Sequence, residues 1–308
     1  MKALLLKKAA TFLFFFWAAG SLIFFLSRSI PGDPVAAMLG KMPSAEDVTR
    51  LRHSLKLDRP LAEQYAHFFK KMLVLDLGDS LITHEPVAGA IGRFFPNTAI
   101  LASTAMVISM VIAFPLGTLA ALKKDSGWNM LSMIFSAIGL AVPSFLLGIV
   151  LIILFSVHWH LLPVSGSGAL TFLVLPAATL TIPLSASLTR MIRSAVAEEL
   201  RRPYVLLAQA KGFSGLQVFS RHVLKNALIP IITFMGLQLG ACLSGTIVIE
   251  NVFSWPGIGT LLITAIRQRD FPMIQGIALF IAAMYLLLNL LVDLSYPFID
   301  PRIRHDRF

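Results

Sequence analysis

The sequence predicts an all-α, polytopic membrane protein with six transmembrane helices, and three observations lead to this prediction. Apolar residues make up 56% of the 308 residues and charged residues only 14%, against roughly 25% charged in a soluble domain. The mean hydropathy is +0.79. Six stretches without Asp, Glu, Lys, Arg or His come close to or exceed the about 20 residues that cross a bilayer. Much of this apolar surface therefore faces lipid.

The six stretches are 9–26, 94–122, 126–157, 161–189, 226–249 and 271–292. The first follows Lys2, Lys7 and Lys8, as the apolar part of a cleaved signal peptide does. It is 18 residues long, however, which exceeds the usual length of about 7–15, and no clear A-x-A site follows it. We therefore expect an uncleaved first helix within residues 1–30.

Lysine and arginine predict the orientation of the chain in the membrane. The amino end holds three, the 123–125 turn two, the 190–225 loop seven and the 302–308 tail three, whereas the 158–160 loop has none and the 250–270 loop two. Positive residues gather in short cytoplasmic loops. The bias predicts that both termini are cytoplasmic. Segment 27–93 is too long for the rule and, by its position, is expected outside.

The chain is expected to divide at these boundaries. Residues 1–30 form the first helix, 31–93 an external amphipathic cap, 94–300 a five-helix core and 301–308 a cytoplasmic tail. Within the cap, the Pro-Gly-Asp-Pro run at 31–34 is expected to stop the first helix. Helical apolar spacing follows in two stretches too short to span, one after Ser44 and one from Leu61 to Met72. We expect both to lie over the outer mouth of the bundle.

The six stretches offer no internal source of energy and no catalytic set. Their middles lack the ionisable groups that gradient-driven transporters use, and Glu250 and Asp293 fall at span ends, where snorkelling or interfacial pairing is the ordinary expectation. No phosphate-binding loop and no catalytic motif is present, and no cofactor is expected. His158 and His160 flank Trp159, which suits interfacial anchoring better than a metal site. Five prolines in or beside the spans indicate either simple kinks or a wet passage.

The loop at 196–226 is the most informative cytoplasmic stretch. Two helical pieces are expected to meet at 212–215, with Gly212 in a left-handed stop and Ser214 capping the second piece. Leu216, Phe219 and Val223 are then expected to form one apolar stripe between basic residues. Such a helix either rests on the lipid surface or enters the groove of a partner protein.

The same loop carries the run Tyr-Val-x-x-Ala-x-Ala-Lys-Gly at 204–212, followed by Arg221-His222 and Asn226-Ala227. In this run the sequence resembles the permeases of ABC importers, in the branch for peptides and nickel. Further motifs follow the family order at 31–34, 57–60, 76–80, 143–144, 162–163, 250–259, 269–276 and 300–302. The Glu-Ala-Ala start of the general importer motif is Leu206-Leu207-Ala208 here, so the salt-bridge role of that Glu cannot be carried over.

The resemblance implies a type I importer permease fold in the bacterial cytoplasmic (inner) membrane, with alternating access. It also implies a heterodimer with a second permease, two ABC ATPase subunits and an external solute-binding protein. It assigns ATPase coupling to Ala208, Ala210, Lys211, Gly212, Leu216, Phe219, Arg221, His222 and Asn226. Its other motif positions are Asp33, Glu250, Pro256, Gly257, Gly259, Asp270 and Pro301.

Peptides are the expected substrate of this permease. The alternatives are nickel or a metal chelate and, from another class, a membrane enzyme or channel.

Overall fold

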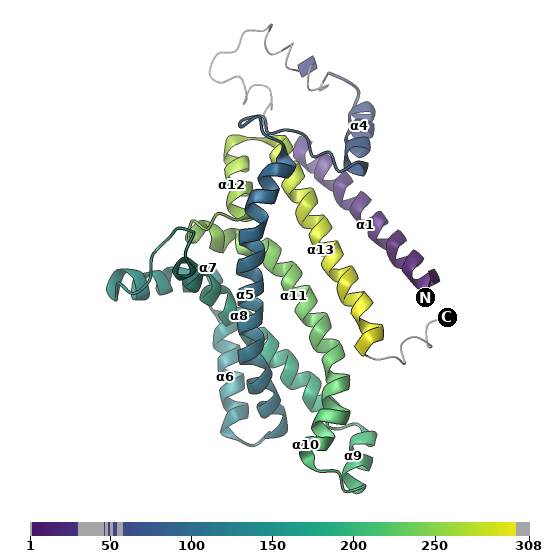
Figure 1. Cartoon of the computed structure of the whole chain (residues 1–308), viewed down its shortest axis with the longest axis vertical. Coiled ribbons are helices and arrows are strands. Elements are labelled where there is room, and N and C mark those ends of the chain that lie inside the picture. Colours follow the sequence, from purple (N-terminus) through teal and green to yellow (C-terminus); the bar gives the residue numbers. More distant parts are fainter. Residues whose placement is uncertain (1, 30–45, 47–48, 50–51, 54–57, 300–308) are drawn as a thin grey trace. The chain divides into compact units, whose positions relative to one another are not determined.

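The computed structural model describes residues 2–29, 46, 49, 52–53 and 58–299, and the regular elements among them are helices (Figure 1). They are α1 (Lys2–Ser29), α4 (Leu61–Leu73), α5 (Val87–Leu122), α6 (Gly127–Ala141), α7 (Ser144–Leu151), η1 (Ile152–His158), α8 (Leu170–Glu199), α9 (Pro203–Ala210), α10 (Gly215–Val218), η2 (Phe219–Val223), α11 (Leu224–Val252), α12 (Ile258–Gln268) and α13 (Phe271–Ile299). The prediction of an all-α chain is confirmed. The predicted helix stop at 31–34, most of the pattern after Ser44 and the tail at 301–308 lie outside the described residues.

Within the described residues, five helical segments are long and apolar enough to cross a bilayer, and one bent helix pair is a candidate for a sixth span. The five are Lys8–Leu26, Val87–Leu122, Leu170–Glu199, Gly215–Cys242 and Phe271–Ser295. The predicted fourth span, 161–189, begins later than expected, at Leu170, and continues past Arg190 and Arg193 to Glu199. The helix therefore continues through these charged residues, beyond its apolar part.

The predicted span at 126–157 is broken. Helix α6 and the helix formed by α7 and η1 meet at an angle of 95°. Val142 has an extended backbone, with φ −87° and ψ 122°, and Pro143 follows it. Proline disfavours helical backbone in the residue before it and lacks an N–H to continue the helix. The stretch predicted as one span is thus bent at Pro143, one of the five prolines for which a kink was one of the two expectations.

The described chain forms two compact units, of which unit 1 holds residues 99–255 and 287–299. In unit 1, α8 packs against α6, α7 and α11. Leu188 and Ile192 of α8 are fully buried, as is Ile231 of α11. A Cβ on Gly139 of α6 would lie 2.6 Å from the Ala186 side chain, so the two helices approach closely because both residues are small.

Unit 2 holds residues 2–98 and 256–286. Helix α4 packs against α1, and the Tyr65 hydroxyl accepts a hydrogen bond from Trp17 Nε1 (2.8 Å) and lies 2.7 Å from Ser21 Oγ. Phe24 is fully buried, with its ring 5.3 Å from the ring of Tyr65. The prediction of a helix from Leu61 to Met72 is confirmed. A second cluster in this unit joins the start of α5 with α12 and α13.

The two units cut across the division expected from the sequence. Residues 256–286 were expected within the five-helix core, but they pack with residues 2–98. The predicted division concerned the sides of the membrane, whereas the units follow side-chain packing. The assignment of segments to sides of the membrane therefore stays a prediction.

Candidate functional site

Residues 203–226 run from the start of α9 to the first turn of α11 and include the short helices α9 and α10, which are joined by a sharp turn. Pro203 starts α9, where the fixed φ of proline suits the first turn and its missing N–H costs nothing. Gly212 has φ +82°, a left-handed backbone that favours glycine. Ser214 then caps α10 in a capping box with Gln217. The predictions of a left-handed Gly212 and a capping Ser214 are both confirmed.

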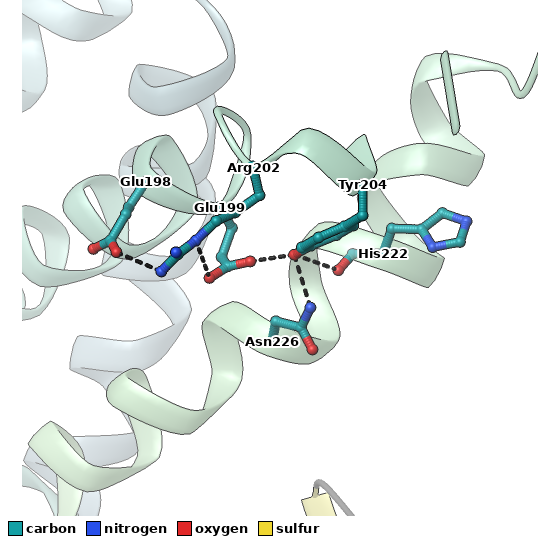
Figure 2. Close-up of polar contacts among 6 residues, drawn as sticks. All are labelled: Glu198, Glu199, Arg202, Tyr204, His222 and Asn226. Atoms are coloured by element: carbon teal, nitrogen blue, oxygen red, sulfur yellow. Dashed lines mark hydrogen bonds and ion pairs between the residues drawn. The ribbon is translucent and has the colours of Figure 1, made fainter. Parts of the chain in front are cut away.

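The hydroxyl of Tyr204 connects this segment to the helices on both sides of it (Figure 2). It donates a hydrogen bond to the carboxylate of Glu199, the last residue of α8. It accepts a hydrogen bond from Nδ2 of Asn226, in the first turn of α11, at 2.7 Å. The carbonyl oxygen of His222 lies 3.5 Å from the same hydroxyl. Tyr204 and Asn226 are 22 positions apart in sequence, and the Tyr204 hydroxyl joins Asn226 of α11 to Glu199 of α8.

Arg202 adds charge to this network (Figure 2). Its Nη2 donates to Oε1 of Glu198 at 2.8 Å, and its Nε lies 3.6 Å from Oε1 of Glu199. Burial, and next the hydrogen bond to Glu199, raise the pKa of Tyr204 above its ordinary value. The phenol is therefore protonated at neutral pH and remains the donor toward Glu199.

The apolar side chains of the segment divide between two faces. Val205, Ala208, Val218 and Val223 are buried in the core of unit 1. The opposite set, with its exposed fractions, consists of Leu206 (60%), Leu207 (57%), Phe213 (39%) and Leu216 (77%). Isolated exposed leucines are ordinary, but four large apolar side chains exposed within residues 206–216 make this segment a candidate contact surface. We refer to these four residues as the apolar patch.

The prediction that Leu216, Phe219 and Val223 form one apolar stripe open to a partner is wrong. Leu216 is exposed, Phe219 is half-buried against the core of unit 1, and Val223 is fully buried. The π-helical geometry of η2, residues Phe219–Val223, rotates these side chains away from the positions that an α-helix would give. The surface open to a partner consists instead of Leu216 with residues from α9 and the turn.

The structure brings several of the predicted coupling residues together. Ala208 lies on the buried face of α9, whereas Ala210, Lys211 and Gly212 are exposed at the end of that helix and in the turn after it. The ring of His222 lies edge-on to Phe213, 5.8 Å between centroids. Arg221 is exposed next to it, and Asn226 anchors Tyr204, as described above. Whether these residues couple to an ATPase stays a prediction.

The other motif positions have structural roles. Glu250 is fully buried in the last turn of α11, so of the two expectations for this span end, snorkelling to water is wrong and interfacial pairing stays a prediction. The Pro256 carbonyl accepts from Asn97 Nδ2 at 2.8 Å, and Gly257 caps α12. Gly259 is buried in the first turn of that helix. Asp33 and Pro301 lie outside the described residues.

Asp270, the remaining motif position, holds a turn at residues 76–86. This aspartate is 2% exposed and precedes α13, where its carboxylate accepts from Met273 N–H. Ser80 Oγ donates to its Oδ2 at 2.5 Å, and Leu81 N–H lies 3.3 Å from its Oδ1. Ser80 Oγ in turn accepts from Ile82 and Thr83 N–H. A buried carboxylate with several donors is strongly held.

The described residues contain no group of three or more His, Cys, Asp or Glu side chains arranged to hold a metal ion. His158 and His160 are both exposed, and His160 Nδ1 lies 3.3 Å from the His158 carbonyl oxygen. The 203–226 segment presents an apolar surface rather than converging catalytic groups. Its arrangement suits protein contact.

Sequence reasoning missed Tyr204, Glu199 and Arg202 as residues of the site. Tyr204 and Asn226 both belong to the run that carried the family resemblance. Their spacing in sequence gives no sign of a contact, because it depends on the reversal of the chain at Gly212. A polar pair at the two ends of a motif that contains a glycine turn was the available signal.

Nearly the whole chain matches two family models. Residues 1–102 match the N-terminal model of binding-protein-dependent transport system membrane components, and residues 113–305 match the binding-protein-dependent transport system inner membrane component.

Curated relatives and one solved structure are also similar to this chain. It is 37% identical over 284 residues to the glutathione transport system permease protein GsiC of Escherichia coli O6:H1, which covers 92% of this chain and 93% of the relative. It is 38% identical over 319 residues to the dipeptide transport system permease protein DppB of Escherichia coli K12, with 93% and 94% covered. A crystal structure of an amino acid ABC transporter with histidines matches 70% of this chain and 94% of that chain, with a TM-score of 0.52. The sequence identity to that structure is 14%, so this likeness concerns the fold alone.

Proposed function

Because this chain belongs to the binding-protein-dependent transport system inner membrane components, the permease subunits of ABC importers, we propose that it forms the translocation path for peptides. A second permease of similar build completes the path as a heterodimer. Two cytoplasmic ATPase subunits supply the energy, and an external solute-binding protein delivers the peptide. The chain itself carries out no covalent chemistry.

The apolar patch on the 203–226 segment is the observation that carries this proposal. Four large apolar side chains are exposed there, with Lys211 and Arg221 beside them. A short helix pair with an apolar surface and a basic surround suits a groove on a partner protein. We assign the ATPase to this patch.

The Tyr204 hydrogen bonds supply a route from the ATPase to the membrane. Through Glu199 and Asn226, the segment is tied to the end of α8 and the start of α11 at once. A displacement of α9 by the ATPase therefore acts on both helices. Differential binding of the ATPase to two arrangements of the permease shifts the population between them, which is the requirement for alternating access.

Peptides are the preferred substrate because of the relatives named above. These relatives are dipeptide and glutathione transport permeases, and each covers more than nine-tenths of this chain. Nickel or a metal chelate is the alternative within the same branch. The solute-binding protein would then set most of the selectivity.

The test is reconstitution of this chain in vesicles with the second permease, the two ATPases and the binding protein. Uptake of a labelled dipeptide, of glutathione and of nickel is measured in parallel. We expect peptide uptake that requires ATP and that persists when proton and sodium gradients are collapsed, since the middles of the predicted spans carry no ionisable residue. Uptake driven by a gradient through this chain alone would contradict the proposal.

A further inference from the structure

A pocket of about 770 Å³ in unit 1 lies between the ends of α5 and α8 and the start of α6. Its floor contains Ala120 and Ala121, which are both buried. Its wall carries five basic side chains against two acidic ones. The basic residues are Lys124, Arg190, Arg193, Arg201 and Arg202, and the acidic residues are Asp125 and Glu198.

Most of the positive charge in this pocket is uncompensated. Arg202 is neutralised by Glu198 and Glu199. The other four cations make no ion pair in the part of the chain that the structure describes, since its ion pairs within unit 1 all involve Arg202. Gathering like charges without partners is costly unless an anion shares the space.

An unpaired acceptor belongs to a residue that lines the same pocket. Asn129, in the first turn of α6, donates through Nδ2 to the Lys124 carbonyl oxygen at 2.6 Å. Its Oδ1 is buried and has no hydrogen-bond partner among the described residues. A buried carbonyl oxygen without a donor costs free energy. A ligand that combines a negative charge with a hydroxyl group would satisfy both features.

The exposed residues near the pocket favour a lipid over a soluble anion. Trp128, beside Asn129, is 45% exposed, and tryptophan favours the membrane interface. Leu122, Met130 and Leu131 are exposed as well, at the ends of the apolar helices α5 and α6. These four residues do not line the pocket, but they lie within two residues of lining residues in sequence, so apolar surface suited to lipid tails is present on the same helix ends as the basic wall. Basic pockets between transmembrane helices on the cytoplasmic side bind anionic headgroups.

We propose that this pocket binds the headgroup of an anionic phospholipid. The phosphodiester lies among Lys124, Arg190, Arg193 and Arg201. A headgroup hydroxyl, such as that of phosphatidylglycerol, donates to Asn129 Oδ1. Glu198 and Arg202 form the edge of the pocket and also belong to the network around Tyr204. The lipid thus lies next to the 203–226 segment.

The test measures lipid retention on the assembled transporter. The complex is delipidated in mild detergent, supplied with phosphatidylglycerol or phosphatidylcholine, and the bound lipids are counted by native mass spectrometry. We expect the wild type to retain phosphatidylglycerol in preference to phosphatidylcholine. Lys124→Gln is expected to weaken retention about fivefold, and Arg190→Gln with Arg193→Gln more than about tenfold. Equal retention of the two lipids would overturn the proposal.

Two further measurements distinguish a specific lipid site from non-specific electrostatic attraction of lipid to the basic surface. Lys123 adjoins Lys124 in the same exposed turn but does not line the pocket, so Lys123→Gln is expected to retain lipid as the wild type does. If both lysine variants lose lipid equally, the attraction is diffuse and the site is wrong. Inorganic phosphate at the same concentration as the lipid is expected not to displace it. Displacement by phosphate would assign the pocket to a soluble anion.

The readout does not depend on transport, so it stands apart from the proposed function. Thermal unfolding of each variant shows whether the chain still folds. Should the double arginine variant unfold, Lys124→Gln in the exposed turn still decides the outcome, with Lys123→Gln as its matched control.

Discussion

The 203–226 segment and the 76–86 turn are both held by a hydrogen-bonding hub, but the two hubs differ in burial. The turn at 76–86 depends on Asp270, which is 2% exposed and accepts from Ser80, Leu81 and Met273. The other segment depends on Tyr204, whose residue is 36% exposed. The Asp270 carboxylate therefore makes its hydrogen bonds in the interior of the chain, whereas the Tyr204 hydrogen bonds lie at the surface.

The apolar side chains of the two regions differ in the same sense. Near the 76–86 turn, Val87 and Ile277 are both fully buried in the same apolar cluster. On the 203–226 segment, the four residues of the apolar patch stay exposed. A region that is complete by itself serves as a fixed element, whereas an incomplete one requires a partner. The comparison therefore predicts folding defects from changes in the turn and assembly defects from changes in the segment.

The largest effect on stability is expected at Asp270. Asp270→Ala leaves Ser80 Oγ and the N–H groups of Leu81 and Met273 without their acceptor, at a cost of about 3 kcal/mol. Thermal unfolding of the purified chain measures the loss. Asp79→Ala is the matched control, because Asp79 is an exposed carboxylate of the same turn whose side chain makes no hydrogen bond or ion pair with the described residues. Equal unfolding temperatures for the two variants would contradict the buried hub.

The next effect is expected on assembly, at Gly212. A side chain at φ +82° is strained, so Gly212→Val costs about 1 kcal/mol or more and redirects α10. We expect the tagged permease to lose its ATPase subunits and its uptake activity while still inserting in the membrane. Gly215→Val is the control, since a Cβ at either glycine meets nothing within 4 Å and only Gly212 has a positive φ. Identical ATPase retention in both variants would argue against a role for the turn.

A smaller and more local effect is expected at Leu216. Leu216→Asp places an unpaired charge in the proposed apolar contact and is expected to weaken ATPase retention by tenfold or so. Leu216→Met keeps an apolar side chain of similar volume and is expected to behave as the wild type. Leu216 is more suitable than Phe219 for this test, because Phe219 packs against the core of unit 1 and its change would disturb folding. Unchanged retention in Leu216→Asp would place the ATPase elsewhere.

The smallest effect is expected at Tyr204. Tyr204→Phe removes the hydroxyl between Glu199 and Asn226, which is expected to lower the free energy of unfolding by about 1 kcal/mol. We expect this variant to transport less peptide per ATP hydrolysed while it keeps the ATPase bound. The pKa of Tyr204 is raised by burial and by Glu199. The stability that depends on the protonated phenol is therefore complete below the ordinary tyrosine pKa and is lost only as the pH rises through the raised value. A wild-type ratio of transport to ATP hydrolysis in Tyr204→Phe would contradict the route through this hydroxyl.

The 203–226 segment illustrates how far local sequence determines a site. Gly212 and Ser214 were predicted correctly because a left-handed turn and a helix cap depend on the residues within one turn of the chain. The stripe of Leu216, Phe219 and Val223 was wrong because helical periodicity assumes an ideal α-helix. The π-helical turn of η2 and the packing of Val223 into the core of unit 1 changed which side chains face outward.

By itself, the sequence determined the helical class of this protein and the approximate positions of its apolar spans, because lipid requires long stretches of apolar residues in helices. Only the tertiary structure decided how those helices bend and which residues meet. The 95° break at Pro143, the packing of 256–286 with 2–98, and the contacts of Tyr204 with Asn226 and of Ser80 with Asp270 all belong to this second group. Ser80 and Asp270 are 190 positions apart, and their contact depends on how whole helices pack, which no local pattern of residues records.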